Sequence, residues 1–240
     1  MKNCDELQII FPLDFERAGK MWILLTEYFK KKDISLKEFT EIKTTLNMAK
    51  RKKHFGFESN TLKISYGNVT NSEHSLLWII KKDIEDIRFD FDEIINIIIQ
   101  QFNILEIFLV NRKYKVWQNT TDIGLYQKYY GDISNLKLID NGSPYPLNAI
   151  EIDISNNPGR RVIRDGYVEA VSSPMFVGED FWNIVGTKKE ELEKLDFLNI
   201  SQINEKTIKI EIKNIDCFID ESTKDIQNKL RETLFGKDKI

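Results

Sequence analysis

Residues 150–161 read Ile-Glu-Ile-Asp-Ile-Ser-Asn-Asn-Pro-Gly-Arg-Arg. Apolar and acidic side chains alternate through the first half of this stretch, which is the period of a half-buried strand. Two asparagines, a proline and a glycine then supply the composition of a tight reversal. Further turn signals follow at Asp165-Gly166 and Ser173-Pro174. We therefore predict an antiparallel meander over 149–172 that brings carboxylates, guanidiniums and aromatic rings close together.

The rest of the chain mixes helical and strand periodicity. The first 53 residues predict two amphipathic helices, over 15–32 and 35–53, the second opening on the capping box Ser35-Leu36-Lys37-Glu38. Further helices are predicted over 93–102, 121–130, 178–185, 187–195 and 222–235, and strands over 61–66, 76–80, 104–110, 113–117 and 207–213. Because helices and strands do not alternate strictly, we predict an α+β fold with a mainly antiparallel sheet, an N-terminal helical pair and a C-terminal helix.

The domain organisation follows from length and from one loop-rich stretch. A chain of 240 residues forms one unit or two lobes of about half that size each. Residues 131–148 combine glycine, proline and the turn sequence Asp140-Asn141-Gly142-Ser143-Pro144. We predict a single α+β unit over 1–240 with an N-terminal lobe over 1–130 and a C-terminal lobe over 131–240.

Composition and charge exclude several classes of protein. The net charge of −3 gives the chain no overall attraction to nucleic acid or anionic lipid, so neither is an expected partner. The longest apolar stretch, 94–99, is interrupted by Asn96 and is far shorter than a membrane span. Cys4 and Cys217 stand 213 positions apart and are predicted not to form a disulfide framework. With no export signal in the first residues, we expect a cytoplasmic protein.

The common catalytic and cofactor motifs are missing from the sequence. His54 and His74 are the only histidines, and neither belongs to an HExxH motif or to a cysteine–histidine cluster. The sequence contains no GxSxG nucleophile turn, no phosphate-binding loop of the Walker type and no GxGxxG fingerprint. We predict no cofactor and no catalytic residue.

Three groups of residues are candidates for contact with a partner. Arg160, Arg161 and Arg164 present planar forks that suit a carboxylate or phosphate, although a turn whose arginines pair with Glu151 and Asp153 is the simpler interpretation. Aromatic rings enriched at interfaces recur at Phe181 and Trp182, although a loop that folds both rings into the core explains them equally. The densest acidic run supplies candidates for binding a basic partner, or else forms a solvated connection: Asp86, Asp90 and Asp92.

One pattern imitates a metal-dependent nuclease. Glu211 and Lys213 flank one residue on a predicted strand, and Asp153 is a second carboxylate elsewhere in the chain. Two carboxylates and a lysine can hold a magnesium ion and polarise a water molecule. An alternating charged strand also gives this spacing by chance, so a hydrolase is the alternative prediction and a protein-binding role the main one.

A family resemblance supports the binding role. The segment 153–161, then Gly166-Tyr167-Val168-Glu169, Gly178 and Phe181-Trp182, resembles a stretch of uncharacterised bacterial immunity-type proteins, and the closing sequence 230–235 is similar too. The resemblance covers about 150–185 and the C-terminal tail. It implies a non-catalytic bacterial protein that neutralises a cognate toxin by direct binding. An adaptor protein without a toxin partner remains a further alternative.

Overall fold

The computed structural model describes residues 3–14, 16–35, 41–42, 49, 51, 53–69, 73–83 and 88–236, with only the backbone at 41–42. Its strands are β1 (Glu6–Pro12), β2 (Glu41–Ile42), β3 (Phe55–Glu58), β4 (Leu62–Asn68), β5 (His74–Lys81), β6 (Glu106–Val110), β7 (Leu138–Asp140), β8 (Ile150–Ile152), β9 (Val162–Arg164), β10 (Tyr167–Glu169), β11 (Met175–Gly178), β12 (Leu198–Asn204) and β13 (Thr207–Ile212). Its helices are α1 (Arg17–Lys31), α3 (Phe91–Gln101), α4 (Arg112–Asn119), α5 (Ile123–Tyr130), α6 (Glu179–Val185), α7 (Lys189–Glu193), α8 (Lys224–Phe235) and the short 3₁₀ helix η2 (Glu221–Thr223).

One large antiparallel sheet organises the described part of the chain. Its strand order is β12-β13-β11-β6-β1-β5-β4-β3-β2, and every neighbouring pair runs antiparallel. Two small two-stranded sheets, β7-β8 and β9-β10, lie outside it. The predicted α+β class with a mainly antiparallel sheet is confirmed.

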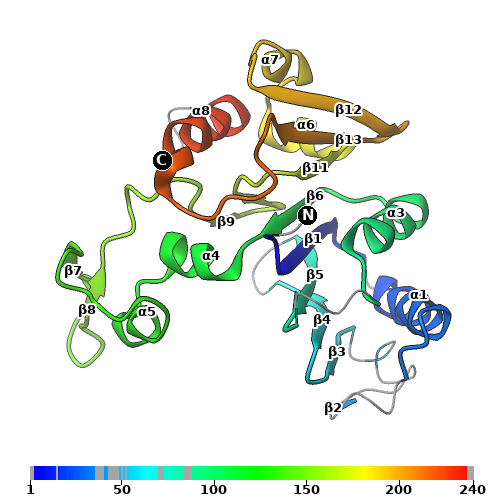
Figure 1. Ribbon diagram of the computed structural model, residues 1–240, viewed down its shortest axis with the longest axis horizontal. Coiled ribbons are helices and arrows are strands. Elements are labelled where there is room, and N and C mark those ends of the chain that lie inside the picture. Colours follow the sequence, from blue (N-terminus) through cyan, green and yellow to red (C-terminus); the bar gives the residue numbers. More distant parts are fainter. Residues whose placement is uncertain are drawn as a thin grey trace.

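The large sheet consists of two halves with related topology, joined by β6 (Figure 1). The first half runs β1, α1, then the meander β3-β4-β5, whose last strand pairs with β1 before α3 follows. The second half runs β11, α6 and α7, then β12-β13, whose last strand pairs with β11 before α8 follows. Both opening strands flank β6 and therefore point the same way.

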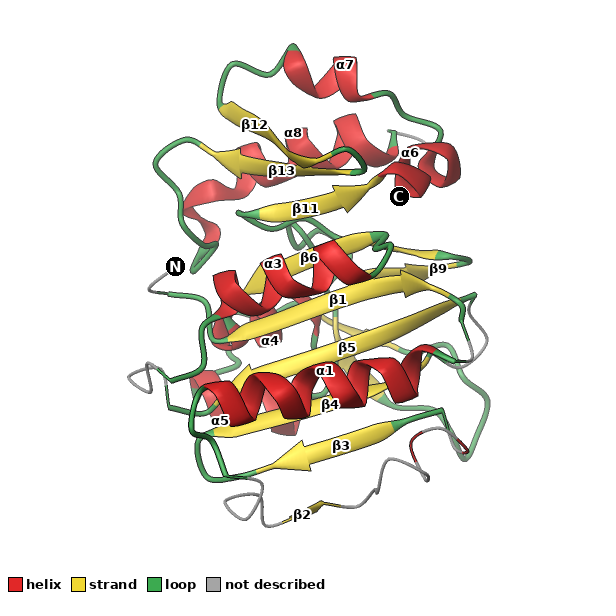
Figure 2. Cartoon of the chain, turned by 90° about the vertical axis from the view of Figure 1, so that its right-hand side faces the viewer, coloured by secondary structure: helices red, strands yellow, loops and turns green. Residues whose placement is uncertain are grey.

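The helices of the two halves cover opposite faces of the sheet. We call the face that carries α1 and α3 the front face and the other the back face. On β6, Ile107 and Leu109 join the front core with α1 and α3, whereas Phe108 joins the back core with α6 and α8. Figure 2 shows α1 and α3 in front of the strands and α8 behind them. A half-turn about an axis along β6 therefore relates the two halves, a repeat that the sequence does not reveal.

Several predicted elements need correction. The stretch 113–117 is part of helix α4 rather than a strand, because the Asn111 side chain accepts a hydrogen bond from the Tyr114 backbone N–H and starts a helix there. Within the predicted helix over 35–53, residues 41–42 form strand β2, whereas Ala49 and Arg51 are helical and most of the rest lies outside the described residues. Strands β1, β3, β7, β11 and β12 were not predicted.

The predicted meander over 149–172 is also wrong in its pairing. Strand β8 pairs with β7, and β9 pairs with β10, so the turn 156–161 joins two separate small sheets instead of forming a hairpin. The local alternation of apolar and polar residues predicted strands β8 and β9. It carries no information about which strand each of them pairs with.

The two cysteines form a disulfide, which corrects the prediction that they stay apart. Cys4 and Cys217 are bonded, with their Cα atoms 6.0 Å apart. Both side chains are buried, at 2% and 6% exposure. The bond links the start of the first half to the segment before α8. The two cysteines are far apart in the sequence, and only the tertiary structure brings them together. The cytoplasmic location, which rested partly on the cysteines, remains a prediction.

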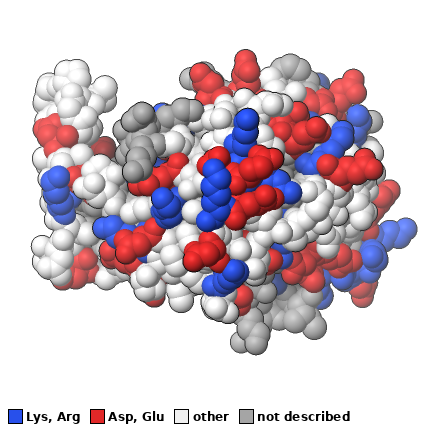
Figure 3. Space-filling model, turned by 90° about the horizontal axis from the view of Figure 1, so that it is seen from above, with Lys and Arg blue, Asp and Glu red and all other residues white. Residues whose placement is uncertain are grey.

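Charged residues of both signs are distributed over the molecular surface. Figure 3 shows Lys and Arg interspersed with Asp and Glu over the face seen from above. Among the helices of the described residues, none is both long enough and apolar enough to cross a bilayer. The division into lobes at 130/131 remains a prediction. Strands β6 and β11, from the two sides of that boundary, pair within the same large sheet.

Candidate functional site

An arm projects from the back face of the sheet. The arm comprises residues 112–154, with α4, α5, β7 and β8 (Figure 1). Figure 2 places α4 and α5 behind the sheet, opposite α1 and α3. In Figure 3 the arm extends to the left of the main body.

The arm exposes large apolar side chains. Tyr145 is 89% exposed and Leu147 71% exposed, both in the loop between β7 and β8. Other large apolar side chains on the same small unit are 41–56% exposed: Leu125, Leu138, Ile139 and Ile150. We call these six residues the arm patch. Leu138 and Ile139 are successive residues of β7 and so face opposite sides of the β7–β8 pair. Several exposed large apolar side chains on one small unit favour a contact surface for another macromolecule.

The turn 156–161 fixes the arm to the body. Gly159 has a φ of +64°, and a Cβ there would lie 2.3 Å from the Gln227 side-chain oxygen and 2.6 Å from the Gln118 side-chain nitrogen. Gln118 on α4 donates to the Pro158 carbonyl at 2.9 Å and to the Gln227 side chain on α8 at 3.0 Å. A left-handed glycine and two buried amides therefore lock the turn between α4 and α8.

The base of the arm covers a polar part of the back face. The side chains of even-numbered residues on β1 face this side, and three rows cross β5, β1 and β6. Trp78, Gln8 and Phe108 form one row, and their backbones lie directly opposite one another. A neighbouring row contains Leu76, Ile10 and Glu106, and the third contains Ile80, Glu6 and Val110. Polar side chains thus occupy positions that a sheet normally fills with apolar ones.

Two cations approach these rows from outside the sheet. Lys115 on α4 forms an ion pair of 2.6 Å with Glu6, and its Nζ lies 5.1 Å from the centre of the Trp78 ring. The Arg161 guanidinium lies 5.9 Å from the centre of the Phe108 ring. We call the side chains that meet here the floor cluster: Glu6, Gln8, Trp78, Glu106, Lys115 and Arg161.

The floor cluster holds buried polar atoms that lack partners. Glu6, Gln8 and Glu106 are at most 2% exposed. Among the described residues, four buried atoms have no hydrogen-bond partner here: Glu6 Oε2, Gln8 Oε1, Glu106 Oε1 and Trp78 Nε1. Native proteins leave few such atoms unsatisfied, so each one requires an explanation.

Ionisation in this region is strongly perturbed. Burial raises the pKa of Glu106 to about 8, against a smaller lowering by the Val168 backbone N–H, which donates to Glu106 at 2.9 Å. Burial, followed by the Arg161 charge, lowers the pKa of His74 at the start of β5 to about 4. Burial also lowers the pKa values of Arg161 and Lys115. At neutral pH, Glu106 is mostly protonated and His74 uncharged. Such clustered shifts favour a functional site.

The structure separates the three predicted arginines. Arg161 belongs to the floor cluster, and its backbone N–H donates to the Asn119 side chain at 2.5 Å. Arg164 binds the buried Glu169 carboxylate at 2.7 Å, and Arg231 on α8 binds the same carboxylate at 2.6 Å. Arg160 lies beside them and accepts a hydrogen bond from Arg231 through its carbonyl. None of the three pairs with Glu151 or Asp153 in the described residues.

The two predicted aromatic residues differ in accessibility. Phe181 is fully buried in the back core, where its ring centre lies 6.1 Å from that of Phe235. The expected surface contact through Phe181 is corrected accordingly: its ring is part of the core. Trp182 is partly buried against the same core and packs edge-on to Phe181, with ring centres 5.3 Å apart.

Two of the three predicted acids, Asp90 and Asp92, lie at the front of the molecule, away from the arm. Asp90 caps α3 by accepting from the Asp92 backbone N–H at 2.9 Å. Both line an open recess of about 440 Å³ with Lys31, Glu93, Asn96, Ile97 and Gln100. Asp86 lies outside the described residues. The recess carries three carboxylates against one lysine.

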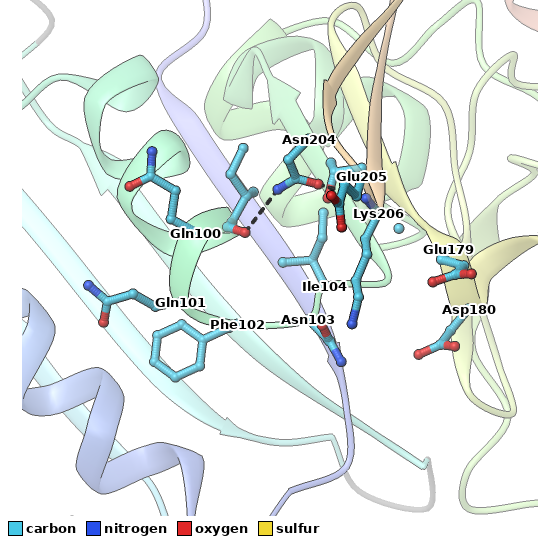
Figure 4. A pocket seen from close by; sticks show the side chains of 13 residues that line it. Gln100, Gln101, Phe102, Asn103, Ile104, Glu179, Asp180, Asn204, Glu205 and Lys206 are labelled. Atoms are coloured by element: carbon cyan, nitrogen blue, oxygen red, sulfur yellow. Dashed lines mark hydrogen bonds between the residues drawn. The ribbon is translucent and has the colours of Figure 1, made fainter.

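A second front recess adjoins the first. It has a volume of about 460 Å³ and lies between the end of α3, the start of α6 and the β12–β13 turn (Figure 4). Figure 4 shows Glu179 and Asp180 on one side, with Glu205 and Lys206 from the β12–β13 turn beside them. Asn204 closes the upper rim by donating to the Ile99 carbonyl at 3.1 Å. This recess also holds three carboxylates against one lysine, so the front of the molecule is locally acidic.

The residues of the alternative nuclease site do not come together. Asp153 pairs with Lys137 at 2.6 Å in the arm, and this lysine lowers its pKa. Glu211 pairs with Lys209 at 2.6 Å on β13, and Lys213 donates to the Asp196 carbonyl at 2.5 Å. Within the described residues, no group of three or more His, Cys, Asp or Glu side chains is arranged to hold a metal ion.

Sequence reasoning found Arg161 but missed the rest of the floor cluster. Glu6 and Gln8 do alternate with Leu7 and Ile9 in the sequence. That alternation could have predicted strand β1, but it would have placed Glu6 and Gln8 on a solvent-exposed face. Only the covering by α4 and the turn 156–161 buries it.

Comparison with known proteins gives no match. No protein-family model, no curated protein and no solved structure matches this chain. Its function is therefore inferred from its own geometry.

Proposed function

We propose that this chain is a non-catalytic binding protein, of the bacterial immunity type, that neutralises a cognate toxin domain by direct contact through the arm. The arm patch is the observation that carries the proposal. A unit this small exposes Tyr145 at 89% and Leu147 at 71% while it projects away from the body. Interface cores are enriched in aromatic and large apolar side chains, and a few of them supply most of the affinity.

The rigid attachment of the arm supports the same role. The turn 156–161 is locked between α4 and α8 by the Gln118 and Gln227 contacts. A preorganised surface loses less conformational entropy when a partner binds. The resemblance of 150–185 to immunity-type proteins covers this turn and the end of the arm.

The test uses a candidate toxin domain, sought among the genes next to the one for this chain. Co-expression is expected to restore growth of cells that produce the toxin domain, and the two chains are expected to co-purify. The double variant Tyr145→Ser/Leu147→Ser is expected to bind at least thirtyfold more weakly by calorimetry, because a central apolar contact contributes about 2 kcal/mol or more. Its thermal melting should stay unchanged, since both side chains are already exposed.

The matched control removes exposed apolar side chains elsewhere. Ile23→Ser/Ile219→Ser alters side chains that are 40% and 51% exposed and lie outside the arm. It should bind as the unmodified chain does. Equal weakening by both double variants would contradict the role of the arm patch, as would failure to protect cells. Sedimentation of the chain alone tests another occupant: a dimer lost in the Tyr145→Ser/Leu147→Ser variant would assign the patch to a second copy.

The acidic recesses have a separate role in this proposal. Asp90 and Asp92 attract a basic partner during its approach, which raises the association rate at low salt. Asp90→Asn/Asp92→Asn keeps a side chain able to cap α3 and is expected to slow association severalfold at low ionic strength. Glu190→Gln/Glu193→Gln on α7 removes the same charge as a control. Unchanged kinetics in the first variant would remove this role. Binding of a partner that is not a toxin would favour the adaptor alternative.

A further inference from the structure

The Arg161 side chain is the starting point, because its positive charge is only partly balanced. Among the described residues, its guanidinium makes no hydrogen bond or ion pair, and its one close contact is the Phe108 ring at 5.9 Å. The nearby Glu6 carboxylate is already paired with Lys115 at 2.6 Å. A half-buried guanidinium that has no acceptor among the described residues is well placed to bind an anion.

The floor cluster contains three possible donors. Arg161 supplies a planar fork, the arrangement that binds carboxylate and phosphate oxygens in pairs. Trp78 supplies an indole N–H that has no acceptor among the described residues. Glu106 supplies a carboxyl group that is 0% exposed and whose Oε1 is unpartnered. In the protonated state this group donates a hydrogen bond instead of repelling an anion.

Two acceptors lie beside these donors. Gln8 Oε1 and Glu6 Oε2 are buried and have no partner in the described part of the chain. Gln8 sits in the row between Trp78 and Phe108, so directly opposite side chains on these strands are about 5 Å apart at Cβ. The cluster reaches the surface through Trp78, Lys115 and Arg161, which stay partly exposed.

We propose that the floor cluster is a binding site for a small oxyanion, a carboxylate or a phosphate, held by Arg161 with Trp78 and Glu106 as additional donors. The acceptors Gln8 and Glu6 then bind a donor group on the same ligand. The site is distinct from the arm patch, so it holds whether or not the chain binds a toxin.

Protonation gives the site a characteristic pH dependence. The charged or titratable groups around Arg161 and Glu106 are Glu6, His74, Lys115 and Tyr167. His74 stays neutral above neutral pH because its pKa is about 4. Glu106 loses its proton near pH 8, and the new negative charge repels an anion. Binding is therefore expected to weaken by up to tenfold for each pH unit above about 8.

The experiment titrates the full chain with sodium acetate and, separately, with inorganic phosphate, against sodium chloride at equal ionic strength. Calorimetry gives the affinity, and the indole N–H resonance of Trp78, assigned with Trp78→Phe, reports contact at the site. Saturable binding by acetate alone identifies a carboxylate ligand, and binding by phosphate alone identifies a phosphate ligand. Arg161→Gln is expected to weaken either by at least tenfold, because a hydrogen bond to a charged group contributes about 1.5–3 kcal/mol.

Two variants keep the test decisive. Lys229→Gln removes one positive charge from an exposed site on α8 and should leave binding unchanged. Glu106→Gln retains an N–H donor without an ionisable group, so it should bind at pH 7 and keep that affinity at pH 9, where the unmodified chain weakens. The pH comparison decides the matter even if Arg161→Gln fails to fold. Chloride binding of equal strength, no saturation by either anion, or parallel pH profiles for Glu106→Gln and the unmodified chain would overturn the proposal.

Discussion

The two halves of the sheet share a topology but treat their helix-free faces differently. In the second half, the front side of β13 carries Lys209 and Glu211, which pair at 2.6 Å while both remain partly exposed. In the first half, the back side of β1 and the adjoining β6 carry Glu6, Gln8 and Glu106, all of them buried. Lys115 on α4 contacts Glu6, and Val168 on β10 contacts Glu106. The same kind of alternating strand therefore gives an ordinary solvated face in one half and a buried polar cluster in the other.

Burial, rather than residue type, therefore sets the pKa values of these side chains and the contribution of their ion pairs to stability. Exposed ion pairs contribute about 1 kcal/mol or less to stability, because water screens both charges. Buried ionisable groups have shifted pKa values, and removing one member of a buried ion pair strongly destabilises the folded state. The following predictions test whether the two halves differ as strongly as their contacts imply.

The largest expected effect comes from separating the two halves. Cys4→Ser/Cys217→Ser removes the bond between the start of the first half and the segment before α8. The free energy of unfolding should fall by about 4 kcal/mol, because a cross-link that closes a long loop limits the freedom of the unfolded chain. Urea denaturation measures the change. A reducing agent should lower the stability of the unmodified chain and leave the variant unaffected; a chain equally stable in both conditions would argue against a role for the bond.

The next effect compares a buried ion pair with an exposed one. Arg231→Gln removes one of two arginines from Glu169, which is 1% exposed. We expect a loss of about 3 kcal/mol, since a buried carboxylate is left with incomplete compensation. Lys209→Gln, the control on the front of β13, should cost less than about 1 kcal/mol. Similar losses in the two variants, measured by urea denaturation, would remove the distinction between buried and exposed ion pairs.

The smallest effect is a pH dependence within the floor cluster. Glu106 keeps its proton in the folded chain up to about pH 8, although its ordinary pKa is 4.5. The folded state therefore binds more protons than the unfolded one, and stability falls as pH rises. His74, whose pKa drops from 6.5 to about 4, has the opposite effect below pH 6.5. Between pH 6.5 and 8, His74 no longer contributes and the effect of Glu106 remains.

Glu106→Gln isolates this contribution. Between pH 6.5 and 8 the unmodified chain should lose about 2 kcal/mol relative to the variant, at about 1.4 kcal/mol per pH unit. Denaturation in a series of buffers gives both curves. Parallel curves across this window would show that Glu106 ionises normally in the folded chain.

Local signals in the sequence were sufficient for several elements. The helices predicted over 93–102 and 121–130 correspond to α3 and α5, which are capped by Asp90 and Asp122. The alternation of 207–213 predicted β13. These predictions succeeded because a cap or an alternating strand depends on neighbours within a few residues.

Long-range pairing could not be predicted in the same way. Strand β8 pairs with β7 and not with β9, and the Lys115 stretch forms helix α4 although it also alternates. Register and partner choice depend on residues more than a hundred positions away, as the pairing of β1 with β6 illustrates. The arm patch was also missed, because an apolar side chain in a strand pattern is normally assigned to the core.

Local sequence was enough to predict the α+β class, several helices and the alternating strands, since each rests on local backbone preference and on the period of apolar residues. Three features follow from tertiary contacts alone: Cys4 meets Cys217, Phe181 is buried, and Arg161 lies over the Phe108 ring near Glu6 and Glu106. The physical reason is that burial and electrostatic environment are set by whichever segment covers a strand. For the back face of β1 that segment lies in α4 and the turn 156–161, far along the chain.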